Sequence, residues 1–191
     1  MNSFNYYQPT EILFGKGRLK EVGKVASKFG CRCLLVTVPA FQEIEPALQL
    51  IKSVLKENGI EVVHFDKVIP NPTTEVVTAG AKLARETEVE FVIGLGGGSS
   101  IDTAKAIAVE ATHQGSCWDY LYFRQPQPTE RTLSIIAIPT TSGTGSNVTA
   151  VAVVTNPLER SKSALSSPRL FPQVSIVDPE LMLTLPPYMT A

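Results

Sequence analysis

The sequence predicts an α/β protein whose core is an open, mostly parallel β-sheet with helices on both faces. Apolar runs rich in β-branched residues alternate along the chain with segments whose apolar residues recur at helical spacing. Runs such as "CRCLLVTV" and "FVIGL" lack the polar alternation of half-exposed strands, as is typical of parallel strands buried on both faces. Regular alternation of strands and helices is the pattern of consecutive βαβ units.

The predicted elements follow one another from the N-terminus. Strands are expected over residues 11–15, 31–38, 60–65, 91–95 and 132–139. Helices are expected over residues 17–29, 42–58 and 74–87, and from the glycines after residue 95 to residue 111. In the second helix Ile44, Leu48, Ile51 and Leu55 are at helical spacing, and Gly59 is placed to end it. After residue 145 we expect a β-rich extension.

Composition excludes several classes of function. The 191 residues carry 17 Lys and Arg against 18 Asp and Glu, so the net charge of −1 gives no basic footprint for nucleic acid. No apolar run approaches the ~20 residues that a membrane-spanning helix needs, and the N-terminus does not have the pattern of a signal peptide. The three cysteines, Cys31, Cys33 and Cys117, are too few for a disulfide framework. We therefore expect a cytoplasmic protein with neither nucleic acid nor a membrane as partner.

A glycine cluster separates the strand at 91–95 from the helix that follows it. Gly96, Gly97 and Gly98 are costly to order, and they stand where free backbone N–H groups and the helix dipole favour an anion. Ser99 is a candidate N-cap, and Asp102 three residues later would complete a variant of the capping box. A tight, well-capped turn is the plain alternative, but three glycines in this position favour phosphate binding. No Gly-Lys-Ser/Thr follows, so the segment is not a P-loop.

A second loop, "IPTTSGTGSN" at residues 138–147, follows the next predicted strand. It carries five hydroxyl side chains, which can donate to phosphate or ribose oxygens and accept from a base: Thr140, Thr141, Ser142, Thr144 and Ser146. A polar surface loop is again the alternative reading. Two small-residue loops at the ends of two strands of one sheet would lie along one rim. Together they suit a long, phosphate-containing ligand better than a small anion.

Four motifs now identify a resemblance: "GLGGGSSIDTAKAIA", "PNPT", "IPTTSGTGSNVTAVAVVTN" and "FPQVSIVDPELMLTLPP". In this order they resemble the iron-containing alcohol dehydrogenase family, from "ILFGKG" to the last residue. The resemblance implies a Rossmann-like domain over residues 1–185 that binds NAD or NADP. Residues 186–191 would then begin a helical domain that supplies the ligands of Fe(II) or Zn. The implied substrate of the full-length protein is a small alcohol or aldehyde.

The resemblance also implies roles for single residues. The loop 96–99 would hold the pyrophosphate, and the loop 140–144 would lie along the adenosine and phosphates. Asn71 would face the cofactor, Lys162 would reach the ribose beside the nicotinamide, and Leu181 would line the nicotinamide side of the cleft. The expected cofactor-binding residues are Val38, Asn71, Gly96, Gly97, Gly98, Ser99, Asp102, Thr140, Thr141, Ser142, Thr144, Lys162 and Leu181.

The sequence departs from the family pattern at three places. Val38 stands where members that use NAD tend to have an Asp, so no carboxylate repels a 2′-phosphate. No Arg or Lys stands near it in the sequence to attract one, and both NAD and NADP remain candidates. Asn147 replaces the acid of the family's TGSE pattern. The third departure is that the sequence ends at Ala191, where the family's helical domain with its metal ligands would begin. His64 and His113 are too far apart in the sequence to make a metal site, so we expect neither metal ligands nor catalytic residues in this chain.

Two functions of different kinds remain open. The chain is either the NAD(P)-binding portion of a metal-dependent alcohol dehydrogenase, inactive by itself, or a stand-alone, non-catalytic nucleotide-binding module. Within the same superfamily, the residues of the motifs "IPTTSGTGS" and "DPELMLTLPP" favour the alcohol dehydrogenase branch over dehydroquinate synthase-like or glycerol dehydrogenase-like enzymes. Because apolar surface would face the second domain, we expect the chain to form homo-oligomers.

Overall fold

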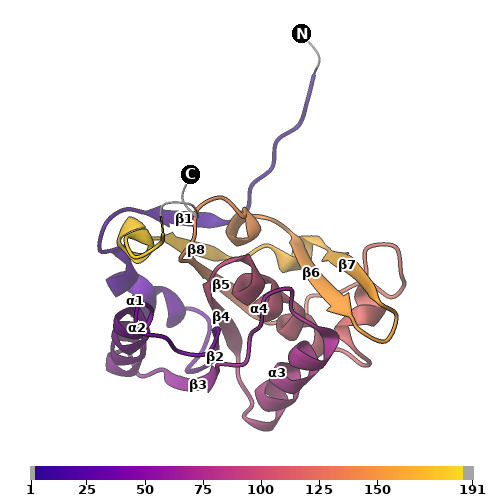
Figure 1. The fold of residues 1–191 in the computed structure, drawn as a ribbon, viewed down its shortest axis with the longest axis horizontal. Helices are drawn as coiled ribbons and strands as arrows, with labels where there is room; N and C mark the ends of the chain where they lie inside the picture. Colours follow the sequence, from indigo (N-terminus) through magenta and orange to yellow (C-terminus); the bar gives the residue numbers. More distant parts are fainter. Residues whose placement is uncertain (1–2, 187–191) are drawn as a thin grey trace.

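The main sheet of the protein has six strands, and helices cover both of its faces (Figure 1). The computed structural model describes residues 3–186. The strands lie in the order β1-β8-β5-β4-β2-β3, and every pairing between neighbours is parallel. Their bounds are β1 (Glu11–Phe14), β2 (Arg32–Val36), β3 (Glu61–Phe65), β4 (Phe91–Gly96), β5 (Ser134–Pro139) and β8 (Val174–Val177). The predicted open, parallel α/β sheet is thus confirmed.

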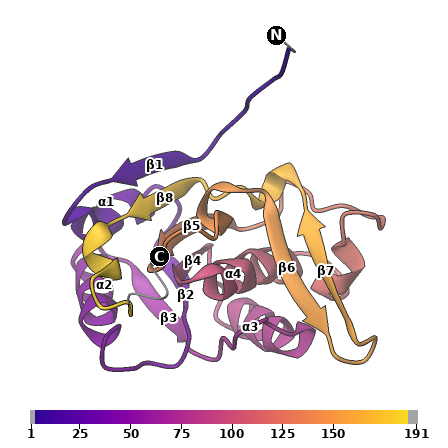
Figure 2. The ribbon, with the colours of Figure 1, turned by 45° about the horizontal axis from the view of Figure 1, so that its top comes forward.

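The helices divide between the two faces as Figure 2 shows. The 3₁₀ segment η1 (Arg18–Glu21), α1 (Val22–Ala26) and α2 (Glu45–Glu57) pack on one face. The opposite face carries α3 (Thr74–Glu86) and α4 (Gly98–Glu110). Each predicted helix is present, although the segment predicted at 17–29 divides into a 3₁₀ turn and a short α-helix.

Side chains of the buried strands alternate between two apolar clusters. In β4, Phe91 and Ile93 belong to the cluster under α1 and α2, whereas Val92 belongs to the cluster under α3 and α4. The helix α2 is amphipathic, with Leu48, Ile51 and Leu55 buried. It ends before Gly59, whose φ of 75° is the left-handed conformation expected of a glycine stop. Burial on both faces explains why these strands lack polar alternation.

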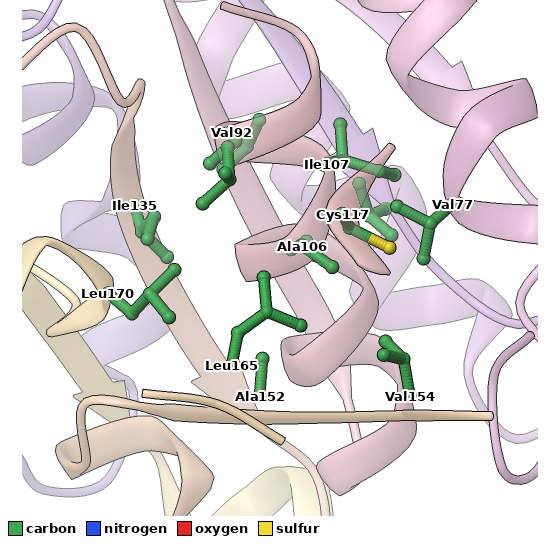
Figure 3. Packing of buried hydrophobic residues seen from close by; sticks show 14 of the residues in the cluster. Val77, Val92, Ala106, Ile107, Cys117, Ile135, Ala152, Val154, Leu165 and Leu170 are labelled. Carbon is green, nitrogen blue, oxygen red and sulfur yellow. The ribbon is translucent and has the colours of Figure 1, made fainter. Parts of the chain in front are cut away.

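The region after residue 145 is β-rich, as predicted. The strands β6 (Val151–Asn156) and β7 (Ser161–Ser166) form an antiparallel hairpin that packs on the outer side of α4. In Figure 3, Ala152, Val154 and Leu165 of this hairpin point toward α4 and the sheet. The helix α4 is therefore enclosed between sheet and hairpin, which explains why ten of its residues are buried.

The last strand, β8, joins the main sheet rather than the hairpin. It is inserted between β1 and β5, where Glu11 is paired with Val174 on one side and Ile136 with Val174 on the other. The short connecting segments are the 3₁₀ turns η2 (Cys117–Tyr120), η3 (Ser146–Val148), η4 (Pro168–Leu170) and η5 (Pro179–Met182).

The strand order reverses between β2 and β4. From β2 the chain runs through α2 to β3 on one side, then through α3 to β4 on the other side of β2. In open α/β sheets, a crevice for ligands forms beyond the carboxyl ends of the strands at such a switch point. None of the helices within residues 3–186 is long and apolar enough to cross a membrane. Except for Pro186, the expected start of a helical domain at 186–191 lies outside the described residues.

Candidate functional site

A cavity of about 700 Å³ opens at the carboxyl ends of β2, β4 and β5. The strand ends contribute Val38, Gly96, Gly97, Thr140 and Thr141 to its lining. The facing walls are mostly apolar and come from α2 and from η5 and the residues after it; they include Ile44, Pro46, Ala47, Leu50, Leu181 and Leu185. The glycine loop and the hydroxyl loop, which the sequence predicted on one rim, thus meet at one cavity.

The backbone of the glycine loop explains why glycine occupies it. Gly96 has a φ of 139°, in the left-handed region, and a Cβ on it would lie 2.5 Å from Ser100 Oγ. A Cβ on Gly97 would only reach ordinary contact with Thr141, at 3.4 Å. A Cβ on Gly98 would lie 3.2 Å from Thr144, so the two loops approach each other closely. These glycines leave the N-terminal N–H groups of α4, at the positive end of the helix dipole, open to an approaching anion.

The predicted cap of this helix is wrong. The N-cap of α4 is Gly97, which has no side chain to accept a hydrogen bond, and the helix begins at Gly98. Ser99 therefore lies inside the first turn. The carboxylate of Asp102 does not close a capping box: it accepts hydrogen bonds from Ser146 Oγ at 2.6 Å and from the backbone N–H of Val153 at 3.1 Å. The extended backbone of Gly97 starts the helix earlier than the spacing of Ser99 and Asp102 suggested.

Burial raises the pKa of Asp102, and its hydrogen bond with Ser146 opposes this shift. Asp102 therefore connects α4 to Ser146 of the hydroxyl loop and to β6, and it is not among the residues that line the cavity. The expectation that it contacts the cofactor is not supported by this position, because its carboxylate is already paired within the protein.

Lys105 is a residue of the site region that sequence reasoning missed. Its side chain is fully buried, and its Nζ donates to the carbonyl oxygens of Ser146, Thr149 and Val151 at 2.6, 2.7 and 2.8 Å. Burial lowers the pKa of Lys105 to about 8, while the charge of Asp102 acts to raise it. The available signal was a lysine in an otherwise apolar stretch, "AKAIAV", three residues after an aspartate.

Asn71 and Lys162 form a second polar group away from the cavity lining. Although 91 positions separate them, Lys162 Nζ donates to Asn71 Oδ1 at 2.6 Å. Asn71 has a φ of 53°, a left-handed conformation that Asn tolerates better than most residues. The backbone N–H of Thr155 in β6 donates to the carbonyl oxygen of Pro72 at 2.9 Å, which ties "PNPT" to the hairpin. The structure therefore brings together two residues that the resemblance assigned to the cofactor.

Leu181 lies at the cavity and not at the Asn71–Lys162 pair. It lines the 700 Å³ cavity together with Val38 and packs against the apolar cluster under α2. Neither Asn71 nor Lys162 lines that cavity. Leu181 is therefore opposite the end of β2 rather than beside Lys162.

One hydroxyl of the cavity has no hydrogen-bond partner within the described protein. Thr141 Oγ1 is buried, and no described group donates to it or accepts from it. A buried polar atom left unpaired costs about 1–3 kcal/mol, and most such atoms in proteins are paired. A bound molecule with polar atoms at this position would supply the missing partner. The other hydroxyls of the loop differ, since Ser142 and Thr144 are exposed beyond the lining.

Charged side chains line the cavity, and they include a cation that the sequence around Val38 did not indicate. No basic residue follows Val38 closely in the chain, but Lys20 of η1 lines the same cavity. Glu43 and Glu180 also line it. Asn147, in place of the family's acid, donates from Nδ2 to Ser175 Oγ of β8 at 2.8 Å. Its amide therefore helps to fix the hydroxyl loop to the sheet.

The residues described here do not fit a resident metal ion. Within residues 3–186 no three His, Cys, Asp or Glu side chains are grouped as a metal site needs. His64 instead interacts with Thr37 and Lys52, and His113 with Thr129. Cys31 is exposed and Cys33 is buried. The glycine loop and the unpaired Thr141 hydroxyl, by contrast, fit a phosphate-containing ligand.

Comparison with known proteins adds independent information. The chain is 42% identical over 194 residues to choline dehydrogenase of Bacillus subtilis (strain 168), an alignment that covers 100% of this chain and 48% of that protein. The chain thus spans about half the length of the curated relatives it matches.

Two solved structures share the fold closely. An archaeal halo-thermophilic alcohol dehydrogenase from a Red Sea brine pool superposes with a TM-score of 0.92 at 38% identity, over 98% of this chain and 49% of that one. Sulfoacetaldehyde reductase from Bifidobacterium kashiwanohense, solved in complex with NAD⁺, superposes with a TM-score of 0.89 at 35% identity, over 99% of this chain and 50% of the other. The family model for iron-containing alcohol dehydrogenase matches residues 9–179. The chain belongs to the iron-containing alcohol dehydrogenase family.

Proposed function

We propose that residues 1–185 are the NAD(P)-binding domain of a metal-dependent alcohol dehydrogenase, and that residues 186–191 lead into a helical domain that holds the metal. The whole enzyme would transfer hydride between the nicotinamide and a small alcohol or aldehyde in the cytoplasm. The observation that carries the proposal is the meeting of the glycine and hydroxyl loops at one cavity, with the Thr141 hydroxyl unpaired. The family and the NAD⁺ complex of a related reductase support it.

The positions of the residues suggest how the cofactor is oriented. We place the adenosine in the apolar cavity between Val38 and Leu181, because a flat base suits these walls. The pyrophosphate then lies at the loop 96–99, at the N-terminus of α4. The nicotinamide half extends toward Lys162 and Asn71, where Lys162 donates to a ribose oxygen. This assignment moves Leu181 from the nicotinamide side, where the resemblance placed it, to the adenosine side.

The cavity accommodates either NAD or NADP in this proposal. Val38 presents no carboxylate that would repel a 2′-phosphate, and Lys20 supplies a cation to the same cavity. Glu43 on the same lining opposes a strong preference for the doubly charged phosphate.

When bound, the nicotinamide supplies the hydride chemistry. What this chain contributes is binding and orientation: an anion site at α4, apolar walls for the base, and the hydroxyls of Thr140 and Thr141. A stand-alone nucleotide-binding module is the second candidate function, because the cavity and its two loops would hold a nucleotide without a further domain.

One pair of measurements tests both candidates. Calorimetric titration of the purified chain with NADH and with NADPH, without added metal, is expected to show binding of at least one. If neither binds at millimolar concentration, the nucleotide site is refuted. Alcohol oxidation with added Fe(II) or Zn is expected to be unmeasurable for these 191 residues, because residues 3–186 hold no group of metal ligands and a bound metal would supply several kcal/mol of charge stabilisation. A longer gene product that oxidises alcohols would favour the dehydrogenase over the module.

We also propose that the isolated chain self-associates. Phe41, on the cavity lining, is 49% exposed, and Leu183 beyond η5 is 79% exposed. Exposed apolar residues around a cleft are typical of a surface that another domain or subunit covers. Light scattering is expected to report a species larger than a monomer, and a clean monomer at high concentration would count against this proposal.

A further inference from the structure

The ring of His113 joins the residues after α4 to the segment 121–132, which leads from η2 into β5. Its Nδ1 lies 2.9 Å from the carbonyl oxygen of Val109, and its Nε2 lies 3.0 Å from the backbone nitrogen of Thr129. A carbonyl oxygen can only accept a hydrogen bond, and a backbone N–H can only donate one. The ring therefore donates from Nδ1 and accepts at Nε2, so both contacts require a neutral imidazole with its proton on Nδ1.

The interior of the segment 121–132 depends on this contact for its attachment. Backbone hydrogen bonds of Tyr122, to β7, and of Leu133, to α4, fix the two ends at 3.1 and 3.2 Å. Between these ends, the hydrogen bonds that join the segment to other parts of the described chain are those of Thr129 with His113. The ring is thus the main fastening of a loop of about ten residues between two backbone anchors.

A second proton on the ring would break this fastening. Protonation places an N–H on Nε2, opposite the N–H of Thr129, so that two donors face each other 3.0 Å apart. The Thr129 hydroxyl, 2.9 Å from Nε2, can rotate to accept from the charged ring, but the backbone N–H cannot. Thr129 must therefore shift its backbone. Imidazole takes up its proton between about pH 8 and about pH 5, the range in which such a change would occur.

The carboxylates on the elements around the ring are engaged elsewhere. Asp119 of η2 and Glu110 of α4 each accept from a backbone N–H near the start of η2, at 2.8 and 2.7 Å. Glu130, next to Thr129, faces Arg169 at 3.9 Å. Within residues 3–186 no ion pair with a carboxylate therefore holds the ring in its charged form. The other titratable or charged side chains on these elements and on α3 are Arg85, Cys117, Tyr120, Arg124 and Arg131.

We propose that His113 is a pH-sensitive latch. At neutral pH its ring holds the segment 121–132 against the end of α4, and in mild acid protonation at Nε2 releases Thr129 and loosens the segment. The inference does not depend on the nucleotide site, because none of these residues lines the 700 Å³ cavity.

The tryptophan of η2 gives this movement a local readout. Trp118 is the single tryptophan of the chain, and it is 4% exposed. Arg124, in the interior of the segment, places its guanidinium carbon 6.0 Å from the centre of the Trp118 ring. When the segment loosens, Arg124 withdraws and water reaches the indole. The fluorescence emission of Trp118 should then shift to longer wavelength.

The two histidines of the chain provide a matched pair of variants. His113→Gln keeps an oxygen that accepts from the N–H of Thr129 but does not titrate, whereas His64→Gln leaves the latch intact. Fluorescence is recorded between about pH 7.5 and about pH 5, a range that spans the titration of imidazole. Wild type and H64Q are expected to show the shift to longer wavelength, and H113Q is not. In hydrogen exchange at about pH 5.5, the amide of Thr129 should exchange about five- to tenfold faster in wild type than in H113Q, as one lost hydrogen bond implies.

Each remaining outcome decides against the latch. It is overturned if the emission of wild type does not shift, or if H113Q shifts as much as wild type. If H113Q does not fold, nitrogen NMR of the wild-type histidine rings takes its place, with H64Q to assign the two rings. At neutral pH the ring of His113 is expected to carry its proton on Nδ1, and a proton on Nε2 overturns the inference.

Discussion

At the scale of single residues, Gly96 and Gly97 are adjacent but are glycine for different reasons. Gly96 needs its left-handed φ of 139°, whereas Gly97 has a φ of −75° that any residue adopts, with room for a Cβ. Gly97→Val should therefore fold with a free energy of unfolding within about 1 kcal/mol of wild type. Its side chain should nevertheless block a phosphate at the N-terminus of α4 and abolish NADH binding in calorimetry.

The control for this prediction is the neighbouring glycine. Gly96→Val should lose stability as well as binding, because valine is strained at positive φ and its Cβ would overlap Ser100. A G97V protein that binds NADH like wild type would show that no phosphate approaches this part of the loop.

His64 shows how a chain of hydrogen bonds reaches the end of β2. Lys52 Nζ can only donate, so His64 Nδ1 accepts from it, at 3.2 Å, and the ring proton is on Nε2. Nε2 then donates to Thr37 Oγ1 at 2.9 Å, and Thr37 donates to the carbonyl oxygen of Val38 at 2.7 Å. Burial and the charge of Lys52 lower the pKa of His64, against smaller opposing effects of Asp66 and Glu45.

The sign of the pH dependence follows from this lowered pKa. As pH falls below about 6.5, His64 takes up a proton in the unfolded chain first, so the free energy of unfolding decreases until the folded-state pKa is passed. His64→Gln removes this contribution. Urea unfolding between about pH 7.5 and about pH 5, a range that spans the ordinary His pKa, should give a steeper loss of the free energy of unfolding for wild type than for H64Q. Parallel profiles would contradict the assignment.

At the scale of elements, α4 shows what a local motif can and cannot predict. The pattern "SSID" was a reasonable capping box, but the true N-cap is Gly97, and Asp102 is used for a contact 44 and 51 residues away. The sequence predicted that a helix is present here, because helix formation depends on neighbours along the chain. The sequence did not predict the partners of Asp102, because they depend on where the hairpin packs.

This correction makes a quantitative prediction. Ser99→Ala should change the free energy of unfolding by less than about 0.5 kcal/mol, since no cap is lost. Asp102→Ala should cost about 2 kcal/mol or more, because it leaves the half-buried N–H of Val153 without its acceptor and removes the charge that faces Lys105. Denaturant unfolding of both variants measures these changes. Equal losses in the free energy of unfolding would indicate that Ser99 and Asp102 do form a capping box.

At the scale of the whole molecule, the alternation of apolar runs was sufficient to predict a parallel sheet and the meeting of two loops on one rim. It was not sufficient to place β8 between β1 and β5, because four residues of strand carry no information about their neighbours. For the same reason the sequence did not indicate that Lys20 and Leu181 line one cavity, because packing of distant segments brings them there. The family resemblance named the candidate residues, and the fold showed which of them lie close together.

The last prediction concerns the stability of the whole domain with cofactor. A ligand that binds only the folded chain, present at 100 times its Kd, raises the free energy of unfolding by about 2.7 kcal/mol. For a domain of this size the melting temperature should then rise by about 5–10 °C. NADH or NADPH should produce this shift without metal. Adding Zn or Fe(II) should produce no further shift, because residues 3–186 hold no group of metal ligands. Thermal scans with cofactor, with and without added metal and chelator, measure this. A further rise in melting temperature that the chelator reverses would indicate a metal site in this chain.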